Sequence, residues 1–121
     1  MVSEQMKVWS AALAAEAGAW PDVVSRSFFG FTGVYRNDIM FAVLPRTRGM
    51  ETANALAFRL DAAAPGLRTQ LEKDNRIGSA QMQKARWFSF ELSSDSDVHD
   101  ALGWLGRAYE AAGANKSKKR R

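Results

Sequence analysis

The spacing of hydrophobic residues predicts a helix near the start of the chain. In the segment Ser3–Ala19, apolar residues recur every three or four positions, as on the buried side of an amphipathic helix. These positions are Met6, Trp9, Leu13 and Ala17. Ser3 is a suitable N-cap, and we expect the helix to end at Gly18 because the residue before Pro21 is pushed towards extended geometry.

A second helical stripe follows at the other end of the chain. It comprises Val98, Leu102, Leu105, Ala108, Tyr109 and Ala112. Three carboxylates, Asp95, Asp97 and Asp100, lie in or near its first turn, where the positive end of the helix dipole favours acidic side chains. Gly113 is expected to end this helix, because glycine readily adopts the left-handed conformation found after a helix.

Between the two helices the pattern predicts strands. Five segments are rich in β-branched and aromatic residues: Val23–Phe29, Thr32–Arg36, Ile39–Pro45, Ala55–Asp61 and Trp87–Leu92. The last two alternate between apolar and polar residues, which predicts strands with one buried face. Asn37-Asp38 tolerates the positive φ of a two-residue hairpin turn, so the flanking strands should be antiparallel neighbours.

The connections between the later strands are less regular. We expect a loop at Arg46–Asn54, a short helix within Ala62–Lys73 and an irregular connection at Asp74–Ala85. The resulting order, α-β-β-β-β-α-β-α, predicts a two-layer α+β fold. In this fold an antiparallel sheet of about five strands carries helices on one face. A chain of 121 residues fits one domain, expected to span 1–115 and to be followed by a disordered basic tail, 116–121.

Composition and charge narrow the picture further. The chain contains no cysteine, which excludes disulfides, thiol nucleophiles and zinc–cysteine sites. No window is long and apolar enough to span a bilayer, and the first residues do not resemble a secretory signal, so we expect a cytoplasmic protein. The net charge of +4 comes from the tail, since the rest of the chain has 12 basic and 13 acidic residues.

The basic tail is a candidate nucleic-acid contact. Its five cationic side chains are Lys116, Lys118, Lys119, Arg120 and Arg121. Such a cluster could bind phosphates with an affinity that falls as salt rises. The alternative is a solvated chain end, because like charges repel and the segment lacks core-forming residues.

The stretch Phe28–Pro45 contains two glycines three residues apart, which raises the alternatives of a phosphate loop and a corner between strands. A phosphate loop usually opens onto a helix and often contains a lysine. The residues after Gly33 are strand-like, and no P-loop lysine-serine pair follows. We therefore interpret Gly30 and Gly33 as permitting a bend or bulge of the backbone.

No set of residues in the sequence forms a recognisable catalytic centre. His99 is the single histidine, and Asp95, Asp97 and Asp100 lack the spacing of a calcium-binding loop. Helix capping explains these acids, although metal binding by the Asp95–Asp100 turn stays open. We expect no cofactor, and no nucleophile–base pair can be assembled.

With these elements in place, the chain resembles the N-terminal domain of TfoX-type competence regulators and the related YjbR (MmcQ)-like domains. The resemblance lies in "SRSFFGFTGVYRNDIMFAVL" and in "ARWFSFEL" followed by "WLGRAYEAA". It implies a helix-covered antiparallel sheet without a catalytic centre, and a role in regulation. The chain departs from the family where a longer loop leads to "AFRL" in place of a "YLK"-like segment.

Three hypotheses for function remain. The first is a non-enzymatic regulatory or interaction module. We expect it to act as a homodimer, because Ile39–Leu44 is apolar on both faces and its open face could meet another copy. Its expected partner surface comprises Ile39, Phe41, Val43 and Trp87. The second is nucleic-acid binding by the tail. The third is a cavity for a small apolar ligand, lined by Trp9, Phe28, Phe31 and Trp104.

Overall fold

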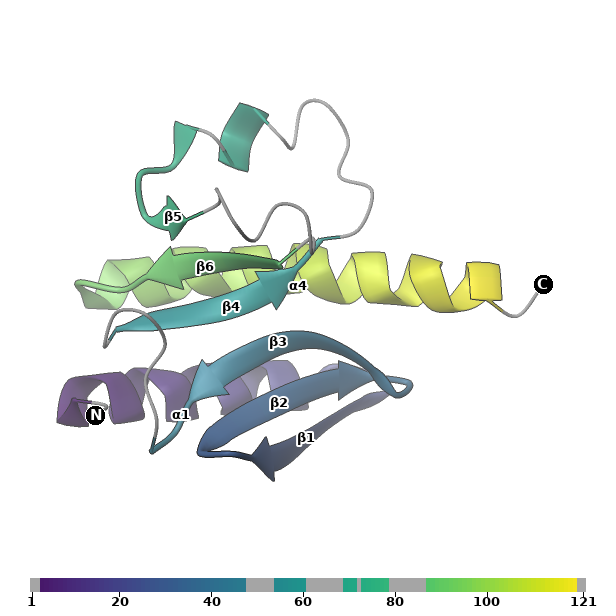
Figure 1. Cartoon of the computed structure of the whole chain (residues 1–121), viewed down its shortest axis with the longest axis horizontal. Helices are drawn as coiled ribbons and strands as arrows, with labels where there is room; N and C mark the ends of the chain where they lie inside the picture. The colour runs from purple at the N-terminus through teal and green to yellow at the C-terminus, as the bar shows by residue number, and fades with distance from the viewer. Residues whose placement is uncertain (1–2, 48–53, 61–68, 72, 79–86, 120–121) are drawn as a thin grey trace.

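The described residues form an α+β sandwich in which two long helices pack on one sheet (Figure 1). The computed structural model describes residues 3–47, 54–60, 69–71, 73–78 and 87–119. The helices are α1 (Glu4–Gly18) and α4 (Asp95–Lys119). The strands are β1 (Val23–Phe28), β2 (Phe31–Arg36), β3 (Ile39–Pro45), β4 (Ala55–Arg59), β5 (Ile77–Gly78) and β6 (Trp87–Glu91).

The sheet is antiparallel throughout, with the order β1-β2-β3-β4-β6-β5. Both α1 and α4 lie on the same side of it, and we call the side without them the helix-free side (Figure 1). The predicted two-layer α+β fold is confirmed. The sequence pattern missed β5, because its two residues, Ile77 and Gly78, give no readable alternation.

The first helix begins and ends where the sequence predicts. The Ser3 hydroxyl accepts a hydrogen bond from the Met6 amide at 3.0 Å, which satisfies one of the free N–H groups of the first turn. Ala19 is the C-cap, directly after Gly18. The predicted apolar stripe from Met6 to Ala17 is buried.

Two tight hairpins join the first three strands. Asn37 and Asp38 have φ values of 51° and 73°, as expected for a two-residue turn whose twist matches the strands. The turn between β1 and β2 has the same form, with Phe29 at 49° and Gly30 at 85°. The glycine stretch is therefore a corner at Gly30, whereas Gly33 lies within β2, opposite Val43.

A β-bulge in β3 changes which side chains face the helices. Val34 is opposite Ala42 and Tyr35 is opposite Met40, so Phe41 is an extra residue in β3. Phe41 and Ala42 both join the core, while Val43 falls on the helix-free side. The prediction that Ile39, Phe41 and Val43 share one face is therefore wrong, because it assumed unbroken alternation.

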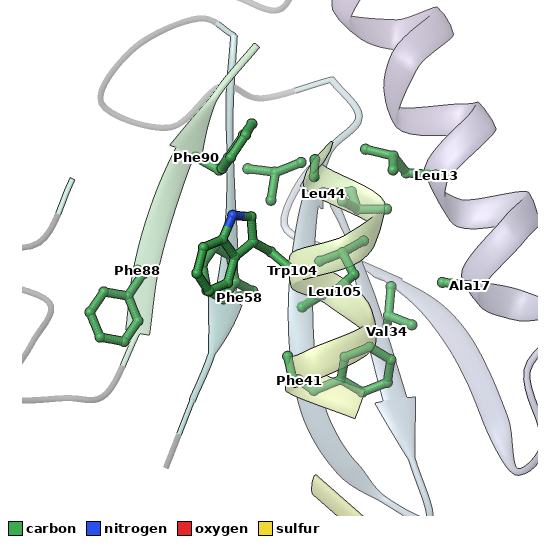
Figure 2. Packing of buried hydrophobic residues seen from close by; sticks show 14 of the residues in the cluster. Leu13, Ala17, Val34, Phe41, Leu44, Phe58, Phe88, Phe90, Trp104 and Leu105 are labelled. Atoms are coloured by element: carbon green, nitrogen blue, oxygen red, sulfur yellow. The ribbon is translucent and has the colours of Figure 1, made fainter. Parts of the chain in front are cut away.

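The core fills the space between the sheet and the two helices (Figure 2). At its centre, the ring of Phe58 is stacked against Phe88 and Trp104, with centroid distances of 5.8 Å and 5.7 Å. A second aromatic group joins the end of β3 to α4, where Phe41 and Trp20 both contact Tyr109. These contacts fix the orientation of α4 on the sheet.

The second helix continues past its predicted end. Gly113 does not terminate α4, which extends to Lys119. A Cβ at Gly113 would meet the guanidinium of Arg36, which lies over the Tyr109 ring at 4.0 Å and donates to the Tyr109 carbonyl oxygen at 2.9 Å. Gly113 is therefore explained by the close approach of Arg36, whose guanidinium a Cβ would displace, and not by a helix end.

This explanation predicts different effects on stability for alanine substitution at two glycines of the same helix. Gly103 has open space around it, so Gly103→Ala is expected to raise the free energy of unfolding by about 0.5–1 kcal/mol. Gly113→Ala should show no such gain, because the new methyl group displaces Arg36. Urea denaturation of both variants measures the difference. Equal stabilisation by both would contradict the role assigned to Arg36.

Two other predicted elements lie partly outside the described residues. In the predicted short helix Ala62–Lys73, residues 69–71 and 73 are helical. The residues 48–53 and 79–86 lie outside the described part of the chain. Among the described helices, none is both long and apolar enough to cross a membrane.

Candidate functional site

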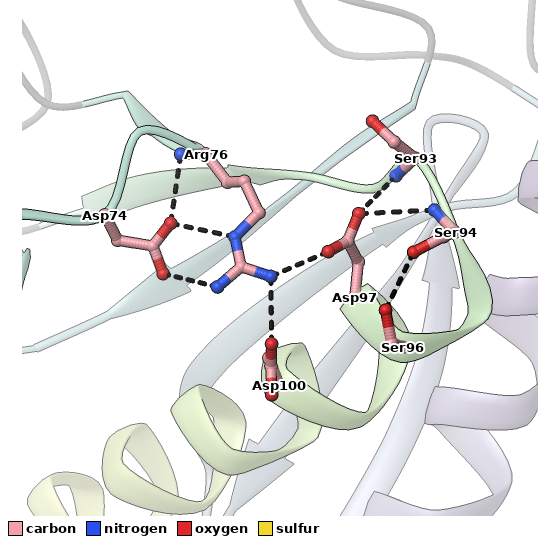
Figure 3. A network of polar contacts seen from close by, with 7 residues as sticks. All are labelled: Asp74, Arg76, Ser93, Ser94, Ser96, Asp97 and Asp100. Carbon is pink, nitrogen blue, oxygen red and sulfur yellow. Dashed lines mark hydrogen bonds and ion pairs between the residues drawn. The ribbon is translucent and has the colours of Figure 1, made fainter.

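The acidic first turns of α4 are organised around one arginine, Arg76, which directly precedes β5 (Figure 3). Its guanidinium forms two hydrogen bonds with Asp74, both at 2.8 Å. The same group donates to Asp97 at 2.7 Å and to Asp100 at 2.9 Å. The cation also lies 4.7 Å from the centre of the Phe90 ring. Arg76 therefore ties the connection after residue 73 to α4 and β6.

Asp97 has a second role as a capping residue. Its other carboxylate oxygen accepts hydrogen bonds from the backbone N–H groups of Ser93 and Ser94, at 2.8 Å and 3.2 Å. These contacts satisfy free donors at the start of α4, as in a capping box. The sequence correctly predicted this dipole and capping function, but it did not indicate Arg76 as the partner.

These contacts shift the protonation of the carboxylates. Hydrogen bonding from Arg76 lowers the pKa of Asp74 despite its partial burial. The pKa of Asp97 is lowered chiefly by the backbone N–H of Ser93 and then by Arg76. The same interactions raise the pKa of Arg76 far above its usual value. At neutral pH the cluster is a charged, internally paired network.

The paired geometry accounts for the acids without a metal ion. Among the described residues, no group of three or more His, Asp or Glu side chains is arranged to hold one. Asp95 accepts a hydrogen bond from the Trp9 indole N–H at 2.9 Å, and His99 is exposed. The carboxylates of the cluster point at the guanidinium, so its positive charge occupies the position between them.

A shallow depression of about 610 Å³ lies beside the cluster. Its lining residues are Gln70, Lys73, Asp74, Asn75, Arg76 and Trp104. The depression is open to solvent, and two of its charged groups, Asp74 and Arg76, are already bonded to each other. Enclosed ligand sites bury most of their ligand surface, which this depression does not do.

The predicted ligand-cavity residues do not surround one space. Trp9 is 7% exposed in α1, and Trp104 is 9% exposed in α4, where its ring is stacked on Phe58. Thr32 pairs with the core residue Leu44 and therefore faces the helices. Phe31 precedes Thr32 in the strand, so it faces the opposite, helix-free side. The side chain of Phe28 lies outside the described residues.

The predicted partner surface is likewise divided between the two sides of the sheet. Phe41 is 1% exposed and packs in the core, with Ile39 packed against the same cluster. Val43 and Trp87 belong to the helix-free side, where Val43 is 9% exposed and Trp87 is half-buried. The four residues therefore do not form one surface.

A different apolar surface lies at the β1 edge of the sheet. On the helix-free side, Val24 is opposite Tyr35 and Tyr35 is opposite Met40, which forms a row across three strands. Arg26 lies on the same side, with its guanidinium 5.7 Å from the centre of the Tyr35 ring. Phe29 stands at the turn that follows β1, five positions after Val24. We call these five residues, Val24, Arg26, Phe29, Tyr35 and Met40, the edge surface.

Exposure is highest at the outer residues of the edge surface. Val24 is 52% exposed and Phe29 is 80% exposed, whereas Tyr35 and Met40 are half-buried. Phe29 also adopts a φ of 49°, which is unfavourable for a bulky side chain and typical of Asn, Asp or Gly in this kind of turn. A signal was present in the sequence, because Phe-Gly occupies a turn position where Asn-Gly is preferred.

The candidate nucleic-acid contacts lie at the end of α4. Lys116, Lys118 and Lys119 belong to the helix, but their side chains lie outside the described residues, as do Arg120 and Arg121. Contact between this segment and nucleic acid stays a prediction.

Comparison with known proteins gives no relative for this chain. No protein-family model, no curated protein and no solved structure matches it.

Proposed function

We propose that this protein is a non-enzymatic regulatory or protein-interaction module that acts as a homodimer through its edge surface. The observation that carries the proposal is the exposure of Phe29 in a strained turn position. The ring is 80% exposed, and strained residues persist where function requires them. Binding to a second protein surface would bury this exposed aromatic ring.

The composition of the edge surface supports the same proposal. Tyr, Phe, Met and Arg are enriched in the central parts of protein interfaces, where aromatic and arginine side chains contribute most of the binding energy. Here Arg26, Tyr35 and Met40 adjoin the exposed Val24 on one side of the sheet. The resemblance to TfoX N-terminal and YjbR-like domains supports a regulatory role.

The polar cluster favours a structural function over an enzymatic one. Catalytic sites need groups whose charge is available to a substrate. Arg76 and the carboxylates Asp74 and Asp97 satisfy one another and the start of α4. We therefore propose that this network holds the connection before β6 and carries no reaction.

Phe29→Asn is expected to separate binding from folding. Asparagine tolerates the positive φ, so the variant should be more stable than the wild type by about 0.5–1 kcal/mol. It should also self-associate at least about tenfold more weakly, because it loses the exposed ring. Sedimentation velocity between about 1 µM and 1 mM, a range that covers interfaces of modest affinity, measures the association.

Val8→Lys is the matched control. Val8 is 62% exposed on α1, so this change removes exposed apolar surface away from the edge surface. It should leave self-association unchanged. A wild-type protein that stays monomeric over the whole range, or equal association of wild type and Phe29→Asn, would contradict the proposed function.

A further inference from the structure

We propose that two copies of this chain pair in antiparallel fashion along β1, with the two-fold axis at Val24, so that their sheets form one continuous sheet. This inference rests on the proposed homodimer and specifies how it forms. It follows from the free edge of the sheet, the direction of the β1 backbone groups and the positions of two opposite charges.

The β1 edge has the features of a strand that accepts a partner. β1 is the terminal strand of the sheet, contains six residues and pairs with β2 without a register shift. It contains no proline, and Arg26 is its one charged residue. Proteins usually protect such edges with bulges, prolines, several charges or very short strands. The opposite edge follows that rule, because β5 has two residues.

The backbone of β1 directs alternate residues outward. In a two-residue hairpin the pair next to the turn is hydrogen-bonded, and the pairs alternate from there. Phe28 is in that pair. At the other end of β1, the Asn37 N–H donates to the Asp22 carbonyl oxygen, so the even-numbered residues from Asp22 to Phe28 direct their backbone groups towards β2. Ser25 and Ser27 therefore direct their N–H and C=O groups away from β2.

The charges select one register for a second copy. With the two-fold axis at Val24, Arg26 of each copy lies opposite Asp22 of the other. An axis at Arg26 would place two guanidinium groups together, and an axis at Ser25 would place Arg26 opposite Val24. Asp22 and Arg26 are both exposed, so both are available for pairing. Opposite charges directly across two strands are stabilising, and like charges are destabilising.

The same register brings the apolar residues of the edge together. The Val24 side chain, which is 52% exposed in one copy, contacts Val24 of the other. The N–H of Ser25 in one copy can donate to the carbonyl oxygen of Val23 in the other. The two-fold axis generates the same bond from the second copy to the first. Phe29 then faces the turn that precedes β1 in the second copy. Main-chain bonds supply affinity in this mode, and side chains supply specificity.

Two charge variants test the arrangement. Arg26→Asp places Asp opposite Asp, and Asp22→Lys places Lys opposite Arg, so each variant alone should dimerise at least about tenfold more weakly than the wild type. A mixture of the two should form a heterodimer, because both contacts are then complementary. The affinity of the mixture should return to within about threefold of the wild type. Sedimentation velocity measures all four samples.

A third variant controls for strain at Asp22, whose φ is 66°. Asp22→Asn keeps a residue that tolerates this conformation and removes the charge, so it should weaken the dimer less than Asp22→Lys does. Thermal unfolding of each variant checks that the domain is folded. Hydrogen exchange of the wild type should show protection of the Ser25 and Ser27 amides that rises with protein concentration.

The outcomes separate this inference from the proposed function. A dimer that ignores both charge variants and leaves Ser25 and Ser27 unprotected would overturn the pairing along β1, while the homodimer itself would stand. Folded charge variants that fail to associate when mixed would overturn the register. A wild-type protein that is monomeric at about 1 mM would overturn both proposals.

Discussion

Phe58→Ala is expected to lower the free energy of unfolding by about 4 kcal/mol, which is a large part of the total stability of a domain this size. Phe58 is fully buried in β4, and its ring is stacked against both Phe88 and Trp104 (Figure 2). Truncation removes the ring through which β4 contacts both β6 and α4. Both the lost burial and the remaining cavity contribute to the cost.

Urea denaturation followed by tryptophan fluorescence measures this effect, since Trp104 contacts the substituted side chain. Phe58→Leu should cost less, because leucine fills part of the cavity. Val8→Ala is the surface control and should change stability by less than about 0.5 kcal/mol, because Val8 is 62% exposed. A cost below about 1 kcal/mol for Phe58→Ala would show that the packing around β4 can collapse to fill the space.

The sequence predicted the elements whose pattern is local. Three predicted features are confirmed: the α1 stripe, the Ser3 cap and the Asn37-Asp38 turn. Each depends only on residues that are close to it in the sequence. The alternation of Phe88 and Phe90 also predicted their burial correctly. In each case local preference and tertiary packing favour the same conformation.

The errors arose where tertiary contacts override local pattern. The bulge at Phe41 reverses the alternation in β3, and the residue types of that strand do not indicate a bulge. Gly113 has the composition of a helix end, but contact with Arg36, 77 positions earlier in the chain, explains it instead. Both features depend on which strand or side chain lies beside the residue, and the order of residues does not specify that.

The candidate site was missed for a related reason. Apolar composition predicts a partner surface on β3, which is the most apolar strand. However, β3 lies inside the sheet, and its residues from Phe41 to Leu44 are buried. Among the described residues, the exposed large apolar side chains of the sheet and its turns are Val24 and Phe29, in the edge strand and the turn that follows it, while Val8 is exposed on α1. The edge surface therefore depends on sheet order, which the sequence pattern left undetermined.

Arg76→Met is expected to lower the free energy of unfolding by about 2 kcal/mol at pH 7, because hydrogen bonds to charged groups are lost and three carboxylates are left close together. Methionine preserves much of the apolar stem over Phe90, so the loss reports mainly on charge. Asp74 and Asp97 are mostly buried, with side chains 15% and 13% exposed, which limits screening by solvent. Lys7→Met is the control, because its ion pair with Glu4 is largely exposed and should contribute little.

The effect of Arg76→Met should depend on pH in a defined direction. The pKa values of Asp74 and Asp97 are lower in the folded protein than the usual value of 3.8. A lowered folded-state pKa stabilises the fold above the unfolded-state pKa, and this contribution disappears as pH falls through the folded-state value. The wild type should therefore lose more stability than the variant between about pH 5 and pH 2, and the two unfolding curves should converge. A difference that stays constant down to pH 2 would show that Arg76 stabilises the fold by its cation–π contact with Phe90 and not by binding the carboxylates.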